Sequence, residues 1–553
     1  MNKQLHSLFV GRLVTGLKRS SISSCSQWAM MYRVMGEPFA GPFSFKHHPW
    51  SKDMHDDESE TIVGMKAAQM GFTEVALNKT FYTIDIKGSS VLYTLPAANP
   101  DATDFSASRF DPALDLSEHL RNMFSDVKNV GHKRAGSASL FIRGSRSRSQ
   151  MKSVPASFIV FDELDEMNRD NVILARERSS GQNVGQEFML STPHIKGYGI
   201  DVFWEESSKA QYYFKCPHCS KMEYLRYPES LVIVGENPHS EEVMKSHLIC
   251  THCKKKLDNE TKSDWLAYTN CEWVPENTDS NISGFAISQM YSMAKKASPG
   301  HIARMALLST SDPVVEQELY NSKLGLCHTV KDAKVNDEDI KNSIGDFNIQ
   351  TGCPAGNCVT MGVDVGPKFL HVEISEYLIK EKNYYKDINS VTLARVLAMM
   401  KVEHFEELDP LFNQFGIEYC VIDAMPERRK SLEFCTRNFG RASMCFYVQG
   451  KVGRVISQNI DEMTVSVGRT VWMDTALVRF KNKSIVIPVN TPMEYKDQVK
   501  EPTRIYERDS DGNPTGRYVN AKADHFAHAR VYSEIALAIT TGAAKNQDMT
   551  EKV

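Results

Sequence analysis

The residues around position 66 have the types that bind the phosphates of a nucleotide. Gly71 and Thr73 match the second glycine and the final hydroxyl of the pattern G-x-x-x-x-G-K-[ST], but Lys66 stands where the first glycine is usual and Phe72 stands where the lysine is usual. Backbone N–H groups of such a loop cradle phosphates while the lysine neutralises them. A lysine at the loop entrance can reach the same phosphates, and Gln69 lies within the loop. The spacing indicates ATP binding and hydrolysis, with an ordinary amphipathic segment as the alternative.

Two adjacent acids could supply the rest of a hydrolysis site. The apolar run 157–163 ends in Asp162 and Glu163. Such a run is typical of a buried parallel strand, and ligands of open α/β sheets bind at the carboxyl ends of strands. Asp162 is predicted to hold Mg²⁺ beside the Thr73 hydroxyl, and Glu163 to polarise the attacking water. A solvated acidic strand end is the alternative.

The flanking segments are those that would position these side chains. Residues 60–63 read as a strand and residues 75–81 as the start of a helix, and this order aims free N–H groups and the helix dipole at an anion. A third strand at 187–190 ends in Ser191 and Thr192. Their hydroxyls could sense the γ-phosphate of ATP, or they form an ordinary loop entry.

A second set of acids follows in the C-terminal part of the chain. Asp364 lies in the apolar strand pattern 359–366, Asp423 ends the pattern 419–423, and Asp524 opens a helix pattern. A buried lone acid is costly unless it is paired or bound to metal. As an ordered set the three could hold two divalent ions, Mg²⁺ or Mn²⁺, which activate water and stabilise the leaving oxygen in phosphodiester cleavage. Each acid alone could instead be a cap or a strand-end turn.

Two cysteine pairs predict a structural zinc site. Cys216 and Cys219 form one C-x₂-C pair, and Cys250 and Cys253 form another. Two such pairs complete a tetrahedral Zn²⁺ site and leave no open position for catalysis. Four unrelated buried thiols or redox pairs are the alternatives.

The whole chain has 553 residues, enough for two to four domains, and a net charge of −4. The overall charge therefore does not argue for nucleic acid, but residues 127–152 carry seven Lys or Arg and no acid. That stretch is either a solvated basic face or a contact with phosphates. No apolar run reaches the length that spans a membrane, so no membrane partner is expected. Apolar residues at helical spacing over 5–17 predict an amphipathic N-terminal helix.

Taken together, these motifs resemble those of the large terminase subunits of tailed double-stranded-DNA phages, the lambda-like GpA family. The resemblance runs from about residue 45 to the final helix. The segments that carry it are 66–74, 105–112, 158–163, 190–193, 216–219, 321–325, 362–364, 422–423 and 523–524.

The resemblance implies an α/β chain with a RecA-like ATPase domain and an RNase H-like nuclease domain. The implied organisation is an N-terminal helical region at 1–44 that could contact a small subunit, an ATPase domain at 45–210, a zinc ribbon at 211–260, a linker or ATPase subdomain at 261–350, and a nuclease domain at 351–545. Lys66, Gly71 and Thr73 would bind phosphate and Mg²⁺, and Glu163 would be the ATPase catalytic acid. The implied nuclease ligands are Asp364, Asp423 and Asp524. Ser191 and Thr192 would couple hydrolysis to movement.

Enzymes of this family cut concatemeric phage DNA, dock on the portal protein of the procapsid and pump double-stranded DNA inside with ATP. They work with a small terminase subunit. The resemblance implies the same partners here, homo-oligomers on the portal, and action in the host cell cytoplasm without incorporation into the virion.

The chain departs from the family pattern at several points. Phe72 replaces the lysine that often follows the second glycine, and alanine directly precedes Asp524 where leucine often stands. His525 and His528 are additional possible ligands. The arginine finger is open among three residues, Arg109, Arg143 and Arg178.

Two other functions fit parts of the pattern: a repair-type helicase-nuclease, and a DNA-binding scaffold with decayed catalytic sites. A helicase should show a second RecA-like repeat, and none follows Cys253. A scaffold should show broken acid sets, and both sets are intact.

Overall fold

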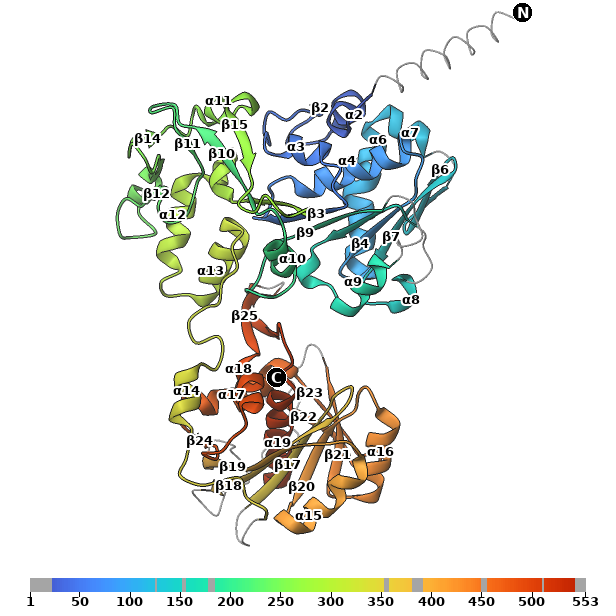
Figure 1. The fold of residues 1–553 in the computed structure, drawn as a ribbon, viewed down its shortest axis with the longest axis vertical. Coiled ribbons are helices and arrows are strands. Elements are labelled where there is room, and N and C mark those ends of the chain that lie inside the picture. Colours follow the sequence, from blue (N-terminus) through green and yellow to red (C-terminus); the bar gives the residue numbers. More distant parts are fainter. Residues whose placement is uncertain are drawn as a thin grey trace, which may run out of the picture. The chain divides into compact units, whose positions relative to one another are not determined.

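The chain folds into two compact units, Met1–Thr329 and Val330–Val553 (Figure 1). The computed structural model describes residues 22–124, 127–151, 156–177, 185–352, 358–379, 391–448, 455–509 and 512–542. The predicted N-terminal helix at 5–17 and Arg178 lie outside these residues. The boundary between the units falls within the segment 261–350.

An eleven-stranded sheet forms the centre of the first unit. Its middle strands run parallel to one another. In spatial order they are β16 (Ser283–Ile287), β3 (Thr61–Lys66), β9 (Gln186–Ser191), β8 (Phe158–Asp162), β4 (Val91–Leu95) and β7 (Ala138–Gly144). The sheet continues beyond β7 through β6 (His132–Ala135) and β5 (Val127–Asn129). Parallel strands are buried on both faces, which explains their continuous apolar runs.

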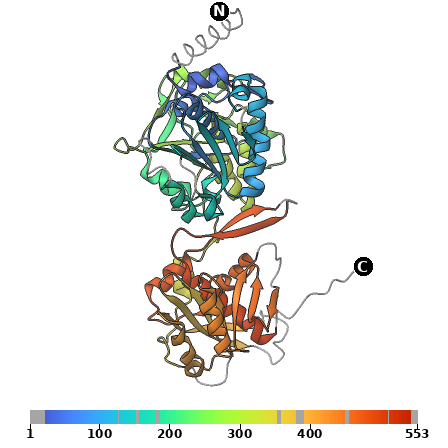
Figure 2. The same ribbon diagram turned by 90° about the vertical axis from the view of Figure 1, so that its right-hand side faces the viewer.

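Successive residues of these strands point to opposite faces and build two separate cores. Ile62 and Phe188 pack in the core beneath α4 (Phe72–Asp85). Their neighbours Val63 and Met189 pack on the other face with α9 (Arg169–Arg176) and α10 (Ile200–Glu206). Figure 2 shows helices on both sides of this sheet. The carboxyl ends of β3, β8 and β9 thus meet along one edge of a sandwiched sheet.

Short helices complete the first unit. They are α2 (Cys25–Tyr32), α3 (Ser51–Asp56), α5 (Thr103–Phe105), α6 (Asp111–Leu116), α7 (Glu118–Met123), α8 (Arg148–Met151), α11 (Lys262–Trp265), α12 (Pro299–Leu308) and α13 (Pro313–Glu318). The cysteine pairs adjoin the sheet, because β10 (Ala210–Lys215) runs parallel to β16 and pairs with β11 (Met222–Glu223) and β15 (Cys271–Val274). A separate small sheet holds β12 (Leu231–Val232), β13 (His247–Ile249) and β14 (Lys256–Leu257).

The second unit is built on an eight-stranded sheet. Its spatial order is β22 (Ile456–Asn459), β23 (Thr464–Val467), β21 (Ala442–Tyr447), β20 (Tyr419–Asp423), β17 (Cys358–Val365), β18 (Leu370–Ile379), β19 (Val391–Val402) and β24 (Ile485–Val486). The strands β17, β18 and β19 form an antiparallel meander, while β20 and β21 run parallel to β17. The other elements are α14 (Asp337–Asn342), α15 (Asp409–Phe415), α16 (Arg428–Arg437), α17 (Arg469–Lys481), α18 (Met493–Lys500) and the hairpin β25 (Thr503–Arg508) with β26 (Pro514–Val519).

The last helix, α19 (His525–Thr541), lies against β17, β18 and β20 (Figure 1). A Cβ atom at Gly362 would lie 1.9 Å from the Ala529 carbonyl oxygen, so only glycine allows the strand and the helix to approach this closely. The fully buried Arg530 of α19 donates to Glu373 of β18 at 2.6 Å and also contacts Glu534. Because removing one partner of a buried ion pair is strongly destabilising, this network fixes where α19 begins relative to the sheet.

The architecture confirms the α/β fold class predicted for both halves of the chain. The strands expected around 60–63, 157–163, 187–190, 359–366 and 419–423 are all present, with ends shifted by a few residues. One shift matters: β3 runs through Lys66, so the lysine ends a strand, and the helix expected near residue 75 already begins at Phe72. Within the described ranges, no helix combines the length and hydropathy needed to cross a membrane.

Candidate active sites

The loop between β3 and α4 has a backbone path that depends on glycine. Gly71 has a φ of +83°, and a Cβ atom there would also lie 3.1 Å from the His48 ring. Gln69 adopts a φ of +60°, which is uncommon for a residue other than glycine. The loop therefore makes the tight turn that a phosphate cradle requires before the helix starts.

Neighbouring segments hold this loop in place. The amide groups of Ala67 and Ala68 donate to the carbonyl oxygens of Ile287 and Ser322, at 2.9 and 2.8 Å. The side-chain amide of Gln289 donates to the Ala68 oxygen at 2.8 Å. The loop is thus shaped by the protein itself, which is the preorganisation that anion binding needs.

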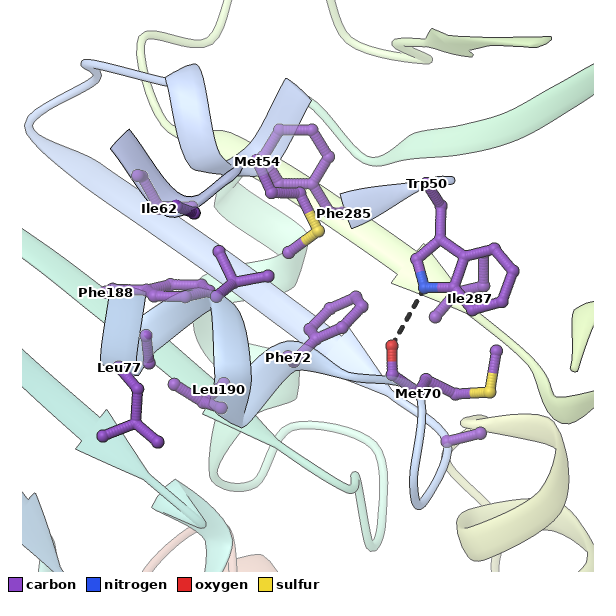
Figure 3. Packing of buried hydrophobic residues seen from close by; sticks show 14 of the residues in the cluster. Trp50, Met54, Ile62, Met70, Phe72, Leu77, Phe188, Leu190, Phe285 and Ile287 are labelled. Carbon is purple, nitrogen blue, oxygen red and sulfur yellow. Dashed lines mark hydrogen bonds between the residues drawn. The ribbon is translucent and has the colours of Figure 1, made fainter. Parts of the chain in front are cut away.

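Phe72 points into the core and away from the loop. Figure 3 shows its ring among apolar side chains, next to the hydrogen bond from Trp50 Nε1 to the Met70 oxygen at 2.9 Å. Its ring fills the space that a side chain at Gly64 would need, since a Cβ atom there would lie 2.7 Å away. A lysine at position 72 would place its aliphatic stem in this core. Packing therefore explains why position 72 holds phenylalanine and the lysine stands at position 66.

Lys66 is directed at the acid predicted to be catalytic. Its Nζ lies 2.8 Å from Glu163 Oε1, although Lys66 is only 5% exposed. Burial alone would lower the pKa of the Lys66 ammonium, but the charges of Glu163 and Asp162 outweigh it and the pKa is raised. Glu163 has a left-handed backbone, with φ +61°, which turns its side chain off the end of β8.

Asp162 lies deeper in the same site. Its Oδ2 accepts a hydrogen bond from the Tyr93 hydroxyl at 2.6 Å. Burial, followed by the charge of Glu163, raises the pKa of Asp162 to about 6, while Lys66 and hydrogen bonds from Tyr93 and Thr73 oppose this. The Thr73 hydroxyl and the Asp162 carboxylate are thus neighbours. These are oxygen ligands of the kind Mg²⁺ takes, so the residues fit that ion.

Ser191 and Thr192 lie at the end of β9, next to the acids. The Ser191 hydroxyl accepts from the Asp165 amide at 3.1 Å, and the Thr192 amide lies 3.5 Å from Glu163 Oε2. Asp165 was not predicted. Its buried carboxylate accepts from the amides of His194 and Ile200, at 2.9 and 2.7 Å, and so joins the segments that follow β8 and β9. Asp165 is the last residue of the sequence Asp-Glu-Leu-Asp at 162–165. The spacing of these acids does not show that Asp165 has a structural role different from that of the first two.

Some of the basic residues in the stretch 127–152 contact other residues of the first unit. Lys133 pairs with Asp111 at 2.7 Å, and Arg143 donates to the Gly131 carbonyl. Arg146 and Arg148 are exposed. Of the arginine-finger candidates, Arg109 is exposed and lies 3.9 Å from Glu74.

The four cysteines predicted to bind zinc converge. Cys216 and Cys253 have Sγ atoms 4.0 Å apart, and those of Cys219 and Cys250 are 3.8 Å apart. All four sulfurs lie within 4.8 Å of one another. A tetrahedron with Zn–S bonds near 2.3 Å has edges of about 3.8 Å, whereas a disulfide needs about 2 Å. The sulfurs therefore fit a tetrahedral metal site and not a pair of disulfides.

The two strand acids of the second unit are neighbours. Asp364 and Asp423 directly follow Val363 and Ile422, which pair in register between the parallel strands β17 and β20. Burial raises the pKa of Asp423 to about 6, an amide hydrogen bond from Met425 lowers it, and the negative charge of Asp364 raises it further. Because these two carboxylates repel each other, a cation bound between them would stabilise both in the ionised form.

Asp524 precedes α19 and lies beside basic groups. Its Oδ2 is 3.4 Å from His528 Nε2 and 3.9 Å from Arg469. Burial opposes ionisation, but His528 and Arg469 outweigh it, and the pKa of Asp524 is lowered. His528 also bonds the Tyr447 hydroxyl at 3.0 Å.

Two histidines join Asp364, and one of them was not predicted. His525 Nδ1 lies 2.7 Å from Asp364 Oδ2, so this residue, an additional possible ligand in the sequence, lies next to one of the predicted acids. His371 faces Asp364 across β17 and β18, and the ligand atoms of Asp364, His371 and His525 all lie within 4.8 Å. The signal was available: residues 364 and 371 flank a short turn, and a hairpin would pair them.

Comparison with known proteins finds two family matches that follow one another along the chain, with the boundary between them before that of the two structural units. Residues 38–273 match the family profile described as phage terminase large subunit gpA, ATPase domain, and residues 282–547 match terminase large subunit gpA, endonuclease domain. The large terminase subunit of Enterobacteria phage P21 is 23% identical over 245 residues, which cover 41% of this chain and 37% of that protein. The chain thus matches well under half the length of this relative.

Two phage terminase structures are among those that align with the chain. The large terminase of bacteriophage HK97 aligns with a TM-score of 0.49 at 9% identity, covering 94% of this chain and 99% of that chain. The nuclease of the large terminase from thermophilic phage G20c, solved with bound magnesium, aligns with a TM-score of 0.25 at 10% identity, covering 37% of this chain and 97% of that one.

The two profiles match consecutive parts of the chain, and each part contains one of the two acid sites described above. The chain therefore belongs to the phage terminase large subunit gpA family and carries both its ATPase domain and its endonuclease domain.

Proposed function

We propose that this chain is the motor and the nuclease of a phage packaging machine, which drives double-stranded DNA into the procapsid with ATP and cuts concatemeric DNA. One observation carries the proposal. Lys66 contacts Glu163 in one unit, while Asp364 and Asp423 follow residues that pair in register in the other unit, and these two separate groups of residues support the proposal.

In the ATPase half, the proposed phosphate ligands are Lys66, Gln69, Gly71 and Thr73. Mg²⁺ would be held by Thr73 and Asp162, and would screen the phosphate charge. Glu163 would accept the proton of the attacking water. Its contact with Lys66 suggests that the γ-phosphate of ATP, which attracts the same ammonium, frees the carboxylate for that task. Ser191 and Thr192 would sense whether Glu163 is paired with Lys66 or released from it, since the Thr192 amide adjoins Glu163.

In the nuclease half, Asp364, Asp423 and Asp524 are the proposed ligands of Mg²⁺ or Mn²⁺. Such ions activate water and stabilise the leaving oxygen of a phosphodiester. Arg469 and His528 hold Asp524 ionised and fix its orientation at the start of α19.

The proposed partners follow from family membership: double-stranded DNA, a small terminase subunit, the portal protein, and further copies of this chain on the portal, all in the host cell cytoplasm. The exposed Arg146 and Arg148 support a contact with phosphates, either of DNA or of ATP in a neighbouring copy. Purified chain should show ATP hydrolysis that rises with added double-stranded DNA, and cleavage of DNA that requires a divalent metal. Absence of either activity from folded protein would contradict the proposal.

We further propose that zinc at the four cysteines is structural. It would anchor the end of β10, whose residue Tyr212 pairs with Trp273 of β15. Trp273 Nε1 donates to the Trp50 oxygen at 2.9 Å, and Trp50 in turn holds Met70 in the phosphate loop. The cysteine site is therefore linked to the ATP site through ordinary hydrogen bonds.

Elemental analysis is expected to find about one zinc per chain, as a filled four-thiolate site requires. Cys219→Ser should lose the zinc, lower the melting temperature and reduce ATP hydrolysis, because metal binding contributes to folding. Cys271→Ser, which changes a thiol outside the cluster, should keep the zinc. Wild-type protein that folds with no zinc would refute the site.

Lys66→Ala is expected to reduce ATP hydrolysis by roughly a hundredfold, because it removes a preorganised positive group from the phosphates. Adding Phe72→Lys to this variant should fail to restore activity, since position 72 faces the core. Lys87→Ala, which removes an exposed lysine paired with Glu58, serves as the control and should keep activity. Full ATP hydrolysis by folded Lys66→Ala protein, measured as phosphate release, would contradict this account of phosphate binding.

A further inference from the structure

His371 is a buried histidine with an unused nitrogen. It is 5% exposed, and its Nδ1 has no hydrogen-bond partner among the described residues. Leaving a buried polar atom unpaired costs about 1–3 kcal/mol, so such an atom usually has a ligand. The space beside it is kept open by Gly366, where a Cβ atom would lie 3.4 Å from Nδ1.

His371 lies in a cluster with the spacing of metal ligands. His525 stacks on it, with ring centroids 4.4 Å apart and planes 16° apart, and its Nδ1 donates to Asp364 Oδ2 at 2.7 Å. Two adjacent ligands around one ion, with bonds near 2.1 Å, are about 3 Å apart. The Asp364–His525 distance is close to that value, and small side-chain movements would bring all three ligand atoms onto one ion.

The three residues come from different elements that are held rigidly together. Asp364 and His371 oppose each other in the β17–β18 register, and His525 begins α19, which is tied to β18 by the Arg530–Glu373 ion pair. Two histidine rings that served only to pack against each other would not require a carboxylate beside them. The combination of two imidazoles and one carboxylate is instead the donor set of a metal site.

We propose that His371 and His525 join Asp364 as ligands of a divalent metal, and that this chain's nuclease therefore prefers a transition metal to Mg²⁺. Imidazole nitrogen suits transition metals, whereas Mg²⁺ takes oxygen ligands. The inference rests on the proposed nuclease function and adds to its three acids two nitrogen ligands that set metal choice.

The test is electron paramagnetic resonance of Mn²⁺ bound to the full, zinc-loaded chain. Electron spin-echo spectra should show nitrogen coupling from histidine, which changes when histidine is labelled with ¹⁵N. His525→Phe keeps an aromatic ring at the half-buried position and should lose part of this coupling. It should also weaken Mn²⁺ binding about tenfold or more, with little change for Mg²⁺. His371→Phe should do the same, and the wild-type spectrum gives a reading even if this buried variant does not fold.

The outcomes separate the inference from the function beneath it. Nitrogen coupling that disappears in Asp364→Asn protein supports the inference. Mn²⁺ that binds in an Asp364-dependent way without nitrogen coupling overturns it and leaves the nuclease proposal standing. Absence of any Asp364-dependent Mn²⁺ binding overturns both.

Discussion

Glu163→Gln is expected to lower DNA-stimulated ATP hydrolysis by roughly 10²–10⁴-fold, the usual contribution of a general base. The amide keeps the size of the side chain but cannot accept the proton of water. The substitution also removes the negative charge that faces Lys66 at 2.8 Å, so ATP binding should be retained or strengthened. Phosphate release and nucleotide binding, measured on the same protein, separate these two effects.

The matched control for this prediction is Glu58→Gln. Glu58 is an exposed acid whose partner, Lys87, is also on the surface, and surface pairs contribute little. This variant should hydrolyse ATP at the wild-type rate. Glu163→Gln protein that folds and hydrolyses ATP normally would remove Glu163 from the catalytic role.

Asp364→Asn is expected to lower metal-dependent DNA cleavage by about a thousandfold, because a bound metal contributes several kcal/mol to the transition state. Asp364 adjoins Asp423 in the sheet and contacts His525, so it is the residue shared by the acids and the histidines. Its loss should weaken metal binding as well as cleavage. Nicking of supercoiled DNA with Mg²⁺ or Mn²⁺ measures the first effect, and calorimetric metal titration the second.

Asp461→Asn provides the comparison for Asp364→Asn. Asp461 is exposed in the turn between β22 and β23 of the same unit. Cleavage should be unchanged in this variant. If Asp364→Asn protein bound metal and cleaved DNA as wild type does, the second active site would have to lie elsewhere.

The parallel strands of both units could be predicted from sequence because burial on both faces gives continuous apolar runs, as in residues 158–161 and 419–422. Acids at the ends of such runs converge for a geometric reason, since the carboxyl ends of parallel strands share one edge. That is why Asp162, Glu163 and Asp423 could be predicted as neighbours of a site from their positions at the ends of such runs, whereas Asp364 was predicted from its place within the run 359–366. The paired cysteines could be found for a similar reason, since each C-x₂-C pair is local.

What the sequence could not show is the set of contacts made across elements. The pairing of Lys66 with Glu163 depends on a left-handed backbone at Glu163, which no sequence pattern indicates. The burial of Phe72 depends on the space left by Gly64 on the neighbouring strand. The short turn between residues 364 and 371 allowed a hairpin, but the spacing alone did not show that His371 pairs with Asp364 in its register. Such contacts need the register of the sheet, and spacing does not give it.

The most direct test of two separate engines in one chain is to measure both activities on both variants. ATP hydrolysis and metal-dependent cleavage would be assayed in parallel for folded Glu163→Gln and Asp364→Asn proteins. The predicted result is a crossed pattern, in which Glu163→Gln loses ATP hydrolysis and keeps cleavage, while Asp364→Asn loses cleavage and keeps ATP hydrolysis. Loss of both activities in either folded variant would contradict the assignment of two independent sites.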